Sequence, residues 1–388
     1  MRLLIAGGGT GGHIYPALAV ARSLRARSAA ADAGAALDLA WMGGHRGLER
    51  SIVPEAGIPL RRLLLRSLRS AGRDIHLVLD PLRLLLSVPQ ALLLLIARRP
   101  AAILTTGGYV AIPVLTAAAL LRIPSVLWEG NVVPGRSVRV VARLASVVAV
   151  SFPETATALA HPRTLVTGTP IREAGVIDPD EARAVFGAVP GERILLVFGG
   201  SQAVRRFNEA VSGALLRLVE RVRVVHVTGD DGYEAALAAR EALPEALRDR
   251  YRPYPFLHAE MTAALDAADL AVGRAGSSTL AEAAAFALPM VVVPYPHAGG
   301  HQRRNAEAYA ASGAATLVDD ADFTADRLVE LAGLLADPAA HARMSAAARD
   351  AARPHAADAV ADLVVALAQR SALPTQAQID AVARGGSR

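Results

Sequence analysis

The chain opens on a short apolar run that leads directly into a glycine-rich loop, and this arrangement constrains the fold more than any other segment. Residues 3–6 are typical of a buried strand, and five glycines and one threonine fill positions 7–12. Pro16 and the apolar residues after it predict a helix, because a proline's missing N–H costs nothing in a first helical turn. Strand, glycine loop and helix together form the arrangement that cradles phosphate groups. His13 adds a titratable group where acid–base chemistry would need one.

The same glycines allow a competing interpretation, a dinucleotide-binding fold. Gly7, Gly9 and Gly12 satisfy the G-x-G-x-x-G pattern after a strand. Such folds also need an acidic residue at the end of the second strand to hold the ribose hydroxyls. The predicted second strand, 37–42, is followed by two glycines and a histidine, and Asp38 lies at its start. The sequence therefore argues against NAD or FAD binding.

Strand-like runs alternate with helical stretches along the 388 residues, a length that favours two domains. The runs lie at 3–6, 37–42, 102–105, 125–128, 146–150 and 164–167, and then at 194–198, 222–228, 270–272, 290–293 and 315–318. This alternation predicts an α/β fold with two doubly wound, Rossmann-like parallel sheets that face a cleft. We expect domains over 1–169 and 170–352, a helix over 353–370 that returns to the first domain, and a disordered tail over 371–388.

Composition narrows the function. Residues 1–168 carry 19 arginines and eight acidic residues, whereas the remainder carries 22 arginines and 28 acidic residues. The basic half predicts an anionic partner, and sparse aromatic residues leave nucleic acid less supported than lipid or a phosphorylated substrate. There is no cysteine and no lysine, which excludes disulfides, thiolate metal sites and a Schiff-base lysine. The first residues form a strand and no signal peptide, so we expect a cytoplasmic setting.

Arginines are densest over 61–99, where apolar residues lie among them. The predicted face consists of Ile75, Leu79 and Leu82, and the arginines before it are Arg66, Arg69 and Arg73. The pattern over 66–82 fits both a surface that lies on an anionic membrane and a core-facing helix with solvated arginines. The apolar run 84–97 contains Pro89 and is too short to span a bilayer, and we interpret it as a core-facing helix.

The second half carries two polar loops. Ser277, Ser278 and Thr279 follow a predicted strand and can cap the next helix or bind a diphosphate. Glu282 could accept two ribose hydroxyls, or it could be a helix-start acid that the helix dipole favours. Residues 294–305 form a loop crowded with polar groups, which more often binds than packs. Its two histidines, at positions 297 and 301, have no carboxylate beside them, so we do not expect a metal site.

Seven motifs in order along the chain resemble the MurG family of N-acetylglucosaminyltransferases, over about residues 2–370. They are residues 8–13, 107–110, 129–131, 168–172, 199–202, 274–276 with Glu282, and 302–305. The resemblance implies the GT-B fold and transfer of GlcNAc from UDP-GlcNAc to the C4 hydroxyl of MurNAc on undecaprenyl diphosphate, which converts lipid I to lipid II. It also implies a peripheral enzyme on the cytoplasmic face of the cell membrane, with other cell-wall synthesis proteins as further partners.

The resemblance also implies roles for single residues. His13 is the expected base, and a helix N-terminus favours a neutral histidine. The expected donor-binding residues are Thr10, Gly11, Gly12, Asn131, Arg172, Ser201, Leu257, Ser277, Ser278, Thr279, Leu280, Ala281, Glu282 and Gln302, and Tyr109 is expected on the acceptor side. Departures from the family pattern are Gly130, Ala203 and Ala275, which affect individual contacts.

The expected reaction inverts the anomeric carbon in one displacement and needs no cofactor. No Asp-x-Asp lies in a nucleotide-facing position, so a protein-bound metal is not expected, while a divalent ion on the diphosphates stays open. Two alternatives remain. One is another nucleotide-sugar enzyme of the same fold, such as a glycolipid glycosyltransferase or an epimerase. The other is a non-catalytic scaffold of the envelope machinery.

Overall fold

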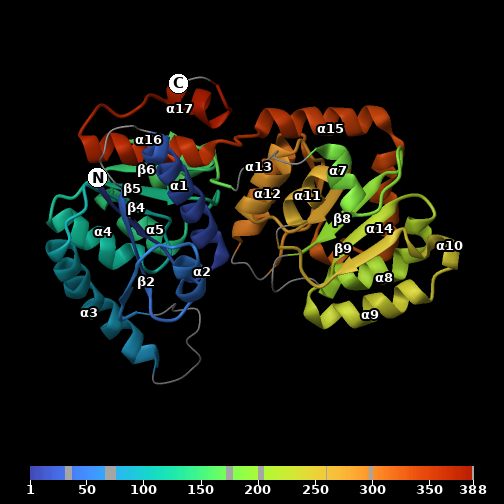
Figure 1. The fold of residues 1–388 in the computed structure, drawn as a ribbon, viewed down its shortest axis with the longest axis horizontal. Coiled ribbons are helices and arrows are strands. Elements are labelled where there is room, and N and C mark those ends of the chain that lie inside the picture. Colours follow the sequence, from blue (N-terminus) through green and yellow to red (C-terminus); the bar gives the residue numbers. More distant parts are fainter. Residues whose placement is uncertain are drawn as a thin grey trace. The chain divides into compact units, whose positions relative to one another are not determined.

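The computed structural model describes residues 1–30, 37–65, 76–171, 178–199, 205–258, 260–296 and 300–386, with side chains in the third segment from residue 80 onward. The chain divides into two compact units (Figure 1). Unit 1 is Met1–Arg172 together with Arg353–Arg388, and unit 2 is Glu173–Ala352. The domain limits inferred from the sequence, at 169 and 352, lie within three residues of these divisions.

Unit 1 is built on a seven-stranded sheet in the order β3-β2-β1-β4-β5-β6-β7, parallel at every pairing. The strands are β1 (Arg2–Ala6), β2 (Asp38–Gly44), β3 (Leu60–Leu63), β4 (Ala102–Thr105), β5 (Ser125–Glu129), β6 (Val147–Val150) and β7 (Thr164–Val166). The strand order reverses between β1 and β4. The carboxyl ends of strands at such a reversal are where open α/β sheets bind their ligands.

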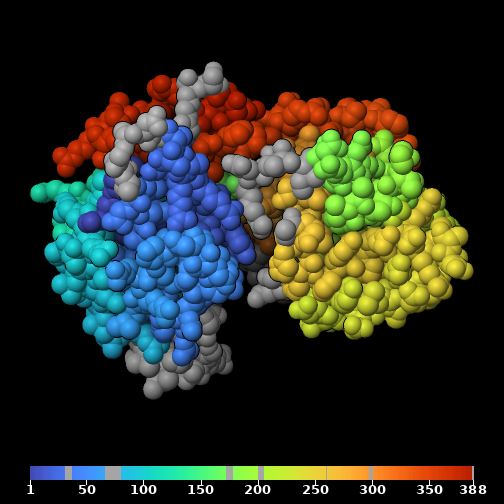
Figure 2. All heavy atoms as spheres, viewed as in Figure 1, coloured from blue at the N-terminus to red at the C-terminus, as the bar shows by residue number. Residues whose placement is uncertain are grey.

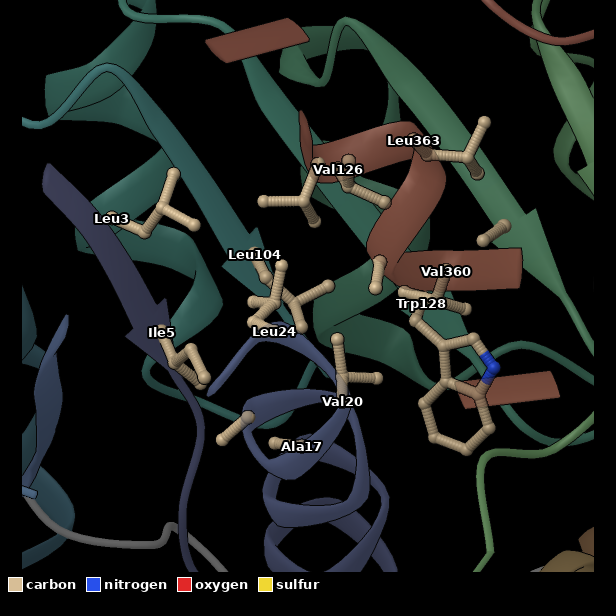
Figure 3. Packing of buried hydrophobic residues seen from close by; sticks show 14 of the residues in the cluster. Leu3, Ile5, Ala17, Val20, Leu24, Leu104, Val126, Trp128, Val360 and Leu363 are labelled. Atoms are coloured by element: carbon tan, nitrogen blue, oxygen red, sulfur yellow. The ribbon is translucent and has the colours of Figure 1, made fainter. Parts of the chain in front are cut away.

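Helices cover both faces of this sheet. They are α1 (Gly11–Ala30), α2 (Glu49–Glu55), α3 (His76–Ala97), α4 (Ala111–Leu120), α5 (Arg136–Val141), η2 (Ala142–Leu144), α6 (Pro153–Leu159), α16 (Ala356–Gln369) and α17 (Gln376–Ala383). Side chains alternate along a strand. Leu3 and Ile5 of β1 therefore enter the core beneath α1 and α16, whereas Leu4 and Ala6 enter the core beneath α3 and α4. Figure 3 shows the first of these cores.

The prediction of a disordered tail from residue 371 is wrong. Residues Gln376–Ala383 form α17, whose start carries a capping box in which Thr375 and Gln378 satisfy each other's backbone N–H groups. The side chain of Ile379 is completely buried in the core of unit 1. Gln376 also pairs with the backbone of Val166 at the edge strand β7. Polar composition suggested disorder, but one buried isoleucine and an edge contact hold the segment in place.

The prediction of a core-facing helix over 84–97 holds for only one side of α3. Ala91 and Leu95 are buried against the sheet, but Leu85 is 68% exposed and Leu93 is 67% exposed. The helix begins at His76, so it is longer than predicted, and among the described helices it alone is long and apolar enough to cross a membrane by length and composition. Its side chains, in teal, lie at the outer surface of unit 1 (Figure 2).

The apolar face predicted at the start of this helix is only partly described. Leu82 is half exposed, as expected of a surface position. Ile75, Arg66, Arg69 and Arg73 lie outside the described residues, and so does the side chain of Leu79.

Unit 2 contains a six-stranded parallel sheet in the order β10-β9-β8-β11-β12-β13. Its strands are β8 (Ile194–Phe198), β9 (Arg223–Val227), β10 (Tyr251–Tyr254), β11 (Leu270–Gly273), β12 (Met290–Val292) and β13 (Ala315–Leu317). Its helices are α7 (Pro179–Val185), α8 (Arg205–Val219), α9 (Asp230–Glu241), α10 (Glu245–Arg248), α11 (Glu260–Ala267), α12 (Ser277–Ala285), α13 (His301–Ala311), η3 (Asp320–Asp322), α14 (Ala325–Ala332), η4 (Gly333–Ala336) and α15 (Pro338–Ala351). The strand order reverses between β8 and β11.

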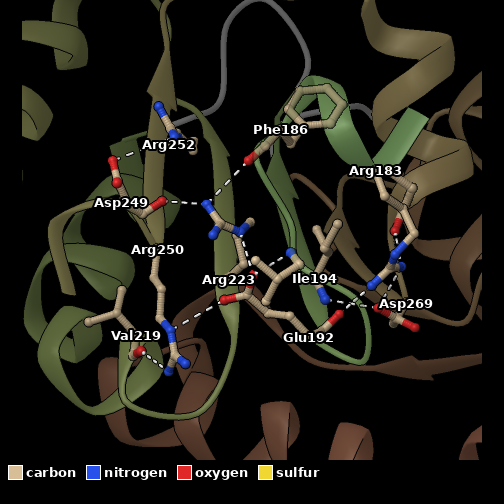
Figure 4. Close-up of polar contacts among 12 residues, drawn as sticks. Arg183, Phe186, Glu192, Ile194, Val219, Arg223, Asp249, Arg250, Arg252 and Asp269 are labelled. Atoms are coloured by element: carbon tan, nitrogen blue, oxygen red, sulfur yellow. Dashed lines mark hydrogen bonds and ion pairs between the residues drawn. The ribbon is translucent and has the colours of Figure 1, made fainter. Parts of the chain in front are cut away.

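Arginine–carboxylate pairs hold the amino ends of the unit 2 strands together (Figure 4). Glu192, before β8, is flanked by Arg223 at 2.8 Å and Arg250 at 3.2 Å. Asp269, before β11, is flanked in the same way by Arg193 at 2.6 Å and Arg183 at 3.3 Å. Each nearly buried carboxylate therefore has two cationic neighbours, as burial of charge requires. These pairs lie at the end of the sheet opposite the loops that follow the carboxyl ends of the strands.

Sequence patterns missed one strand in each unit, β3 and β10. Both are edge strands with polar or proline positions, which read as L-R-R-L and Y-R-P-Y. An edge strand tolerates polar residues and proline, and in β3 and β10 these interrupt the apolar run by which the other strands were recognised.

Candidate active site

The β1–α1 loop of unit 1 lies where the strand order reverses. Gly9 has a positive φ of 93°, which only glycine adopts without strain. The carbonyl of Thr10 accepts from the N–H groups of His13 and Ile14 at 3.1 and 3.2 Å, and α1 begins there. Among the described residues, no acceptor faces the N–H groups of Thr10, Gly11 and Gly12. The loop therefore presents the row of donors that an anion needs.

His13 is held in one orientation by the neighbouring β4–α4 loop. Its Nδ1 lies 2.6 Å from the carbonyl oxygen of Thr106, and the hydroxyl of Thr106 donates back to the carbonyl of His13 at 2.8 Å. A carbonyl only accepts, so Nδ1 carries the proton and Nε2 of a neutral ring carries the lone pair. Gly107 and Gly108, both with positive φ, pass alongside the ring. The orientation of the half-buried imidazole is thus fixed through Nδ1.

Tyr109, expected on the acceptor side, directs its hydroxyl inward. The hydroxyl donates to Oε1 of Glu49 at 3.3 Å, with the carbonyl of Arg46 at 3.4 Å. Burial and the neighbouring Glu49 carboxylate raise the pKa of Tyr109 well above its ordinary value. The phenol therefore stays protonated and acts as a donor.

Sequence reasoning missed Glu49. Its side chain is completely buried, and it accepts from the N–H groups of Gly9 and Gly44, each at 2.9 Å. The acid sought at the end of the second strand is therefore present, but five residues beyond Gly44 and on helix α2. It is hydrogen-bonded to protein backbone, which is not the arrangement that holds a ribose.

Asn131 is positioned by a second buried carboxylate, that of Glu129. Oε1 of Glu129 accepts from both the backbone N–H and the side-chain amide of Asn131 at 2.9 Å. Its Oε2 accepts from the N–H of Gly135 at 2.9 Å, which closes the β5–α5 loop. The motif Glu129-Gly-Asn131 thus fixes the asparagine through its own glutamate.

In unit 2 the β11–α12 loop presents an uncapped helix start. Gly276 is the N-cap and no side chain caps the helix. Ser277, Ser278 and Thr279, all half-buried, occupy the first turn. Glu282 is half-buried one turn further on, so it is not a first-turn acid. Ala281 is also half-buried, whereas the side chain of Leu280 is buried in the core, so only the backbone of Leu280 can meet a ligand.

Asn305 of α13 joins this helix to the β11–α12 loop, and Gln302 of α13 closes the neighbouring β12–α13 loop. Buried Asn305 donates to the carbonyl of Ala275 at 3.1 Å, and the N–H of Tyr295 donates to the side-chain oxygen of Gln302 at 2.8 Å. Arg274 pairs with Asp320 at 2.5 Å and stacks on the ring of Phe207. The sequence alone identifies Arg274 and Asn305 only as parts of motifs. Their packing shows that they shape the loops.

Two expected site residues, Arg172 and Ser201, lie outside the described residues, and so does His297, for which no role was expected. Leu257, after β10, is half-buried beside the stacked rings of Phe256 and His258. Within the described ranges, no group of three or more His, Cys, Asp or Glu could hold a metal ion.

Comparison with protein families assigns both units. The glycosyltransferase family 28 N-terminal domain matches residues 3–150, and the family 28 C-terminal domain matches residues 194–362. The first match contains His13, Glu49 and Asn131, and the second contains the β11–α12 and β12–α13 loops.

Curated relatives match almost the whole chain. The UDP-N-acetylglucosamine–N-acetylmuramyl-(pentapeptide) pyrophosphoryl-undecaprenol N-acetylglucosamine transferase of Desulforudis audaxviator (strain MP104C) is 38% identical over 376 residues, which cover 95% of this chain and 99% of the relative. The enzyme of the same name from Nitrosococcus oceani is 40% identical, over 93% of this chain and 97% of the relative.

Solved structures agree in fold. The crystal structure of Acinetobacter baumannii MurG matches with a TM-score of 0.75 and 28% identity, over 94% of this chain and 99% of that chain. A UDP-N-acetylglucosamine 2-epimerase from Listeria monocytogenes matches with a TM-score of 0.68 and only 14% identity, which shows a shared fold and nothing more.

Proposed function

The chain belongs to the MurG family within glycosyltransferase family 28, and on that premise we propose that it is the hexosyltransferase that converts lipid I to lipid II. It moves GlcNAc from UDP-GlcNAc to the C4 hydroxyl of MurNAc in undecaprenyl-diphospho-MurNAc-pentapeptide, a step of peptidoglycan synthesis. The observation that carries the proposal is the orientation of His13, whose Nδ1 is occupied by the carbonyl of Thr106.

The chemistry is one inverting displacement. GlcNAc is α-linked in the donor and β-linked in the product. The acceptor oxygen O4 attacks C1 as the bond between C1 and the phosphate oxygen of UDP breaks. The proton of O4 passes to Nε2 of His13, a general-base contribution of about 10²- to 10⁴-fold. The N–H groups of Thr10, Gly11 and Gly12 face the diphosphate charge.

The donor is assigned mainly to residues of unit 2, and Asn131 and Arg172 of unit 1 have donor roles besides the N–H groups of the glycine loop. The first turn of α12 and Arg172 with Ser201 hold the diphosphate, Glu282 accepts from the ribose hydroxyls, and backbone groups at Leu257 meet the uracil. Gln302 and Asn131 contact the sugar. The displacement oxidises and reduces nothing, so the proposal includes no redox cofactor. A divalent cation on the diphosphate would accompany the substrate.

The outer face of α3 supports a peripheral position on the cytoplasmic face of the membrane. Leu82, Leu85, Leu86, Leu93 and Ile96 are exposed at helical spacing, and the exposed Arg98 and Arg99 follow the helix. The opposite side of α3 is packed in the core, so the exposed apolar face supports the proposal that the helix lies on a bilayer. A lipid-linked acceptor cannot leave the bilayer, and basic residues near an anionic surface each contribute about 1 kcal/mol. Other cell-wall synthesis proteins could meet the enzyme there.

The decisive experiment supplies the purified protein with UDP-GlcNAc and lipid I. The proposal expects UDP release matched by formation of lipid II. An epimerase would change UDP-GlcNAc without any acceptor, a glycolipid glycosyltransferase would use another acceptor, and a scaffold would do neither. Any of these three results would contradict the proposed function.

Replacement of His13 tests the base. His13→Ala should lower kcat by roughly 10²- to 10⁴-fold while the Kd for UDP-GlcNAc stays nearly unchanged. The matched control is His161→Ala, because His161 is another half-buried histidine of unit 1 that contacts a backbone carbonyl. A folded His13→Ala protein that loses less than about fivefold would limit His13 to substrate positioning.

Glu282 tests the nucleotide site. Glu282→Ala should weaken binding of UDP-GlcNAc by about 1.5–3 kcal/mol, because the ribose hydroxyls lose a charged acceptor. Calorimetry with a donor that lacks both ribose hydroxyls provides the control, and there the loss should be much smaller. Equal losses with both donors would point to a structural role in α12.

The α3 face tests the membrane proposal. The triple variant Leu85→Ser, Leu93→Ser and Ile96→Ser should bind anionic vesicles at least about tenfold more weakly, because apolar area no longer leaves water. Activity on a short-chain, water-soluble acceptor should persist, and added salt should weaken vesicle binding of the wild type.

A matched triple variant in unit 2 controls for surface apolarity. Val185, Val189 and Leu216 are exposed to a comparable degree, and their replacement with serine should leave vesicle binding unchanged. Unchanged binding of the α3 variant would show that the docking surface lies elsewhere.

A further inference from the structure

A buried carboxylate lies directly beneath the glycine loop of unit 1. The side chain of Glu49 is inaccessible to solvent, and both of its oxygens accept hydrogen bonds. Oε2 accepts from Gly9 at 2.9 Å, and Oε1 accepts from Gly44 at 2.9 Å and from Tyr109 at 3.3 Å. Three separate loops, after β1, β2 and β4, therefore converge on one carboxyl group.

The partners of Glu49 define its chemical form. All three are donors, and an ionised carboxylate is the form that only accepts. No arginine lies within salt-bridge distance of it among the described residues, in contrast to the flanked carboxylates Glu192 and Asp269. Its charge is therefore stabilised by backbone N–H groups and one phenol. A group buried in this way requires all of its hydrogen bonds, because each lost partner leaves a desolvated charge.

Glycines make room for this carboxylate. A Cβ on Gly8 or on Gly47 would overlap the oxygens of Glu49, and one on Gly43 would come within 2.8 Å of its Cγ. Gly9 turns its N–H inward through a positive φ of 93°. The glycines that resemble a phosphate-binding loop thus have two roles. On the inner side they leave room for Glu49, and on the outer side they are available to a ligand.

Glu49 separates the backbone N–H groups of the glycine loop into one that is occupied and three that meet no acceptor among the described residues. The N–H of Gly9 is occupied by Glu49, whereas those of Thr10, Gly11 and Gly12 meet no acceptor in the described structure. His13 follows in the first turn of α1, and its N–H returns to Thr10. The hydrogen bond to Glu49 thus fixes the Gly9 peptide two residues before the start of α1.

We propose that Glu49 is a positioning residue for the transfer reaction, an internal anion that holds the inner side of the glycine loop so that its outer N–H groups and His13 meet the substrates. This inference rests on the proposed function. Glu49 touches no reacting atom, because Gly8 and Gly47 cover it and no part of it reaches the surface. It acts through Gly9 and the start of α1.

The test replaces Glu49 with glutamine, which keeps the shape and removes one of the two accepting oxygens. Glu49→Gln should lower kcat by about 10²-fold, because a misplacement of about 1 Å suffices for such a loss. The KM for UDP-GlcNAc should change much less than kcat, because His13 and the loop N–H groups act on the proton and the charge that move in the transition state, while α12 and Glu282 hold the nucleotide. Glu55→Gln, an exposed change on the same helix, should behave as wild type.

Amide hydrogen exchange gives a readout that does not depend on activity. In the wild-type protein, the amides of Gly9 and Gly44 should exchange much more slowly than those of Gly11 and Gly12. In Glu49→Gln, the protection of at least one of the first pair should fall. The wild-type comparison needs no variant, so it holds even if Glu49→Gln does not fold.

Two results would overturn the proposal. One is a wild-type Gly9 amide that exchanges as fast as that of Gly11, which would mean that the hydrogen bond to Glu49 is absent. The other is a Glu49→Gln enzyme with kcat within about threefold of the wild-type value. If the wild-type protein makes no lipid II, the proposed function fails instead, while the exchange experiment still decides whether Glu49 holds the loop.

Discussion

The loops at the carboxyl ends of the unit 1 strands depend on buried carboxylates that satisfy their backbone N–H groups. Loops of this kind leave many amides without partners, and an orphaned buried amide is costly. Glu49 accepts hydrogen bonds from backbone amides at the carboxyl ends of β1 and β2, and Glu129 accepts one from the loop after β5. The remaining outward amides, at Thr10 to Gly12, are then free to serve a ligand without loosening the loop. Rigidity and ligand binding thus come from the same glycines.

The central strands of both sheets could be predicted because each is buried on two faces and reads as a continuous apolar run. The edge strands β3 and β10 could not, since arginine and proline interrupt their apolar pattern, whereas the other two edge strands, β7 and β13, keep short apolar runs. The last helix was missed for a related reason. Its stability rests on one buried isoleucine, a capping box and a contact with Val166, and none of these changes the average polarity that a sequence window measures.

Some residues of the candidate site could likewise be predicted from the sequence and others could not. His13 could be predicted because a histidine beside a glycine loop is unusual, and the structure adds the carbonyl of Thr106 that fixes its tautomer. Glu49 could not, since it lies 40 residues from Gly9 and its role depends on the positive φ of that glycine. A dinucleotide-binding fold has an acid after its second strand, and Glu49 lies in that region of the chain. A ribose-binding acid would face its ligand, whereas the carboxylate of Glu49 is buried within the protein.

Both units use buried or nearly buried carboxylates, but the partners of these carboxylates differ. In unit 2, Glu192 and Asp269 each sit between two arginines at the amino ends of the strands, where no ligand is expected and rigidity alone is needed. In unit 1, by contrast, the printed partners of Glu49 within the described ranges are two backbone N–H groups and one phenol. The exposed face of α3 belongs to the same unit as the glycine loop. Under the proposed function, the helix that meets the lipid-linked acceptor and the histidine that deprotonates it therefore lie in one compact unit, because α1 and α3 pack on the same sheet.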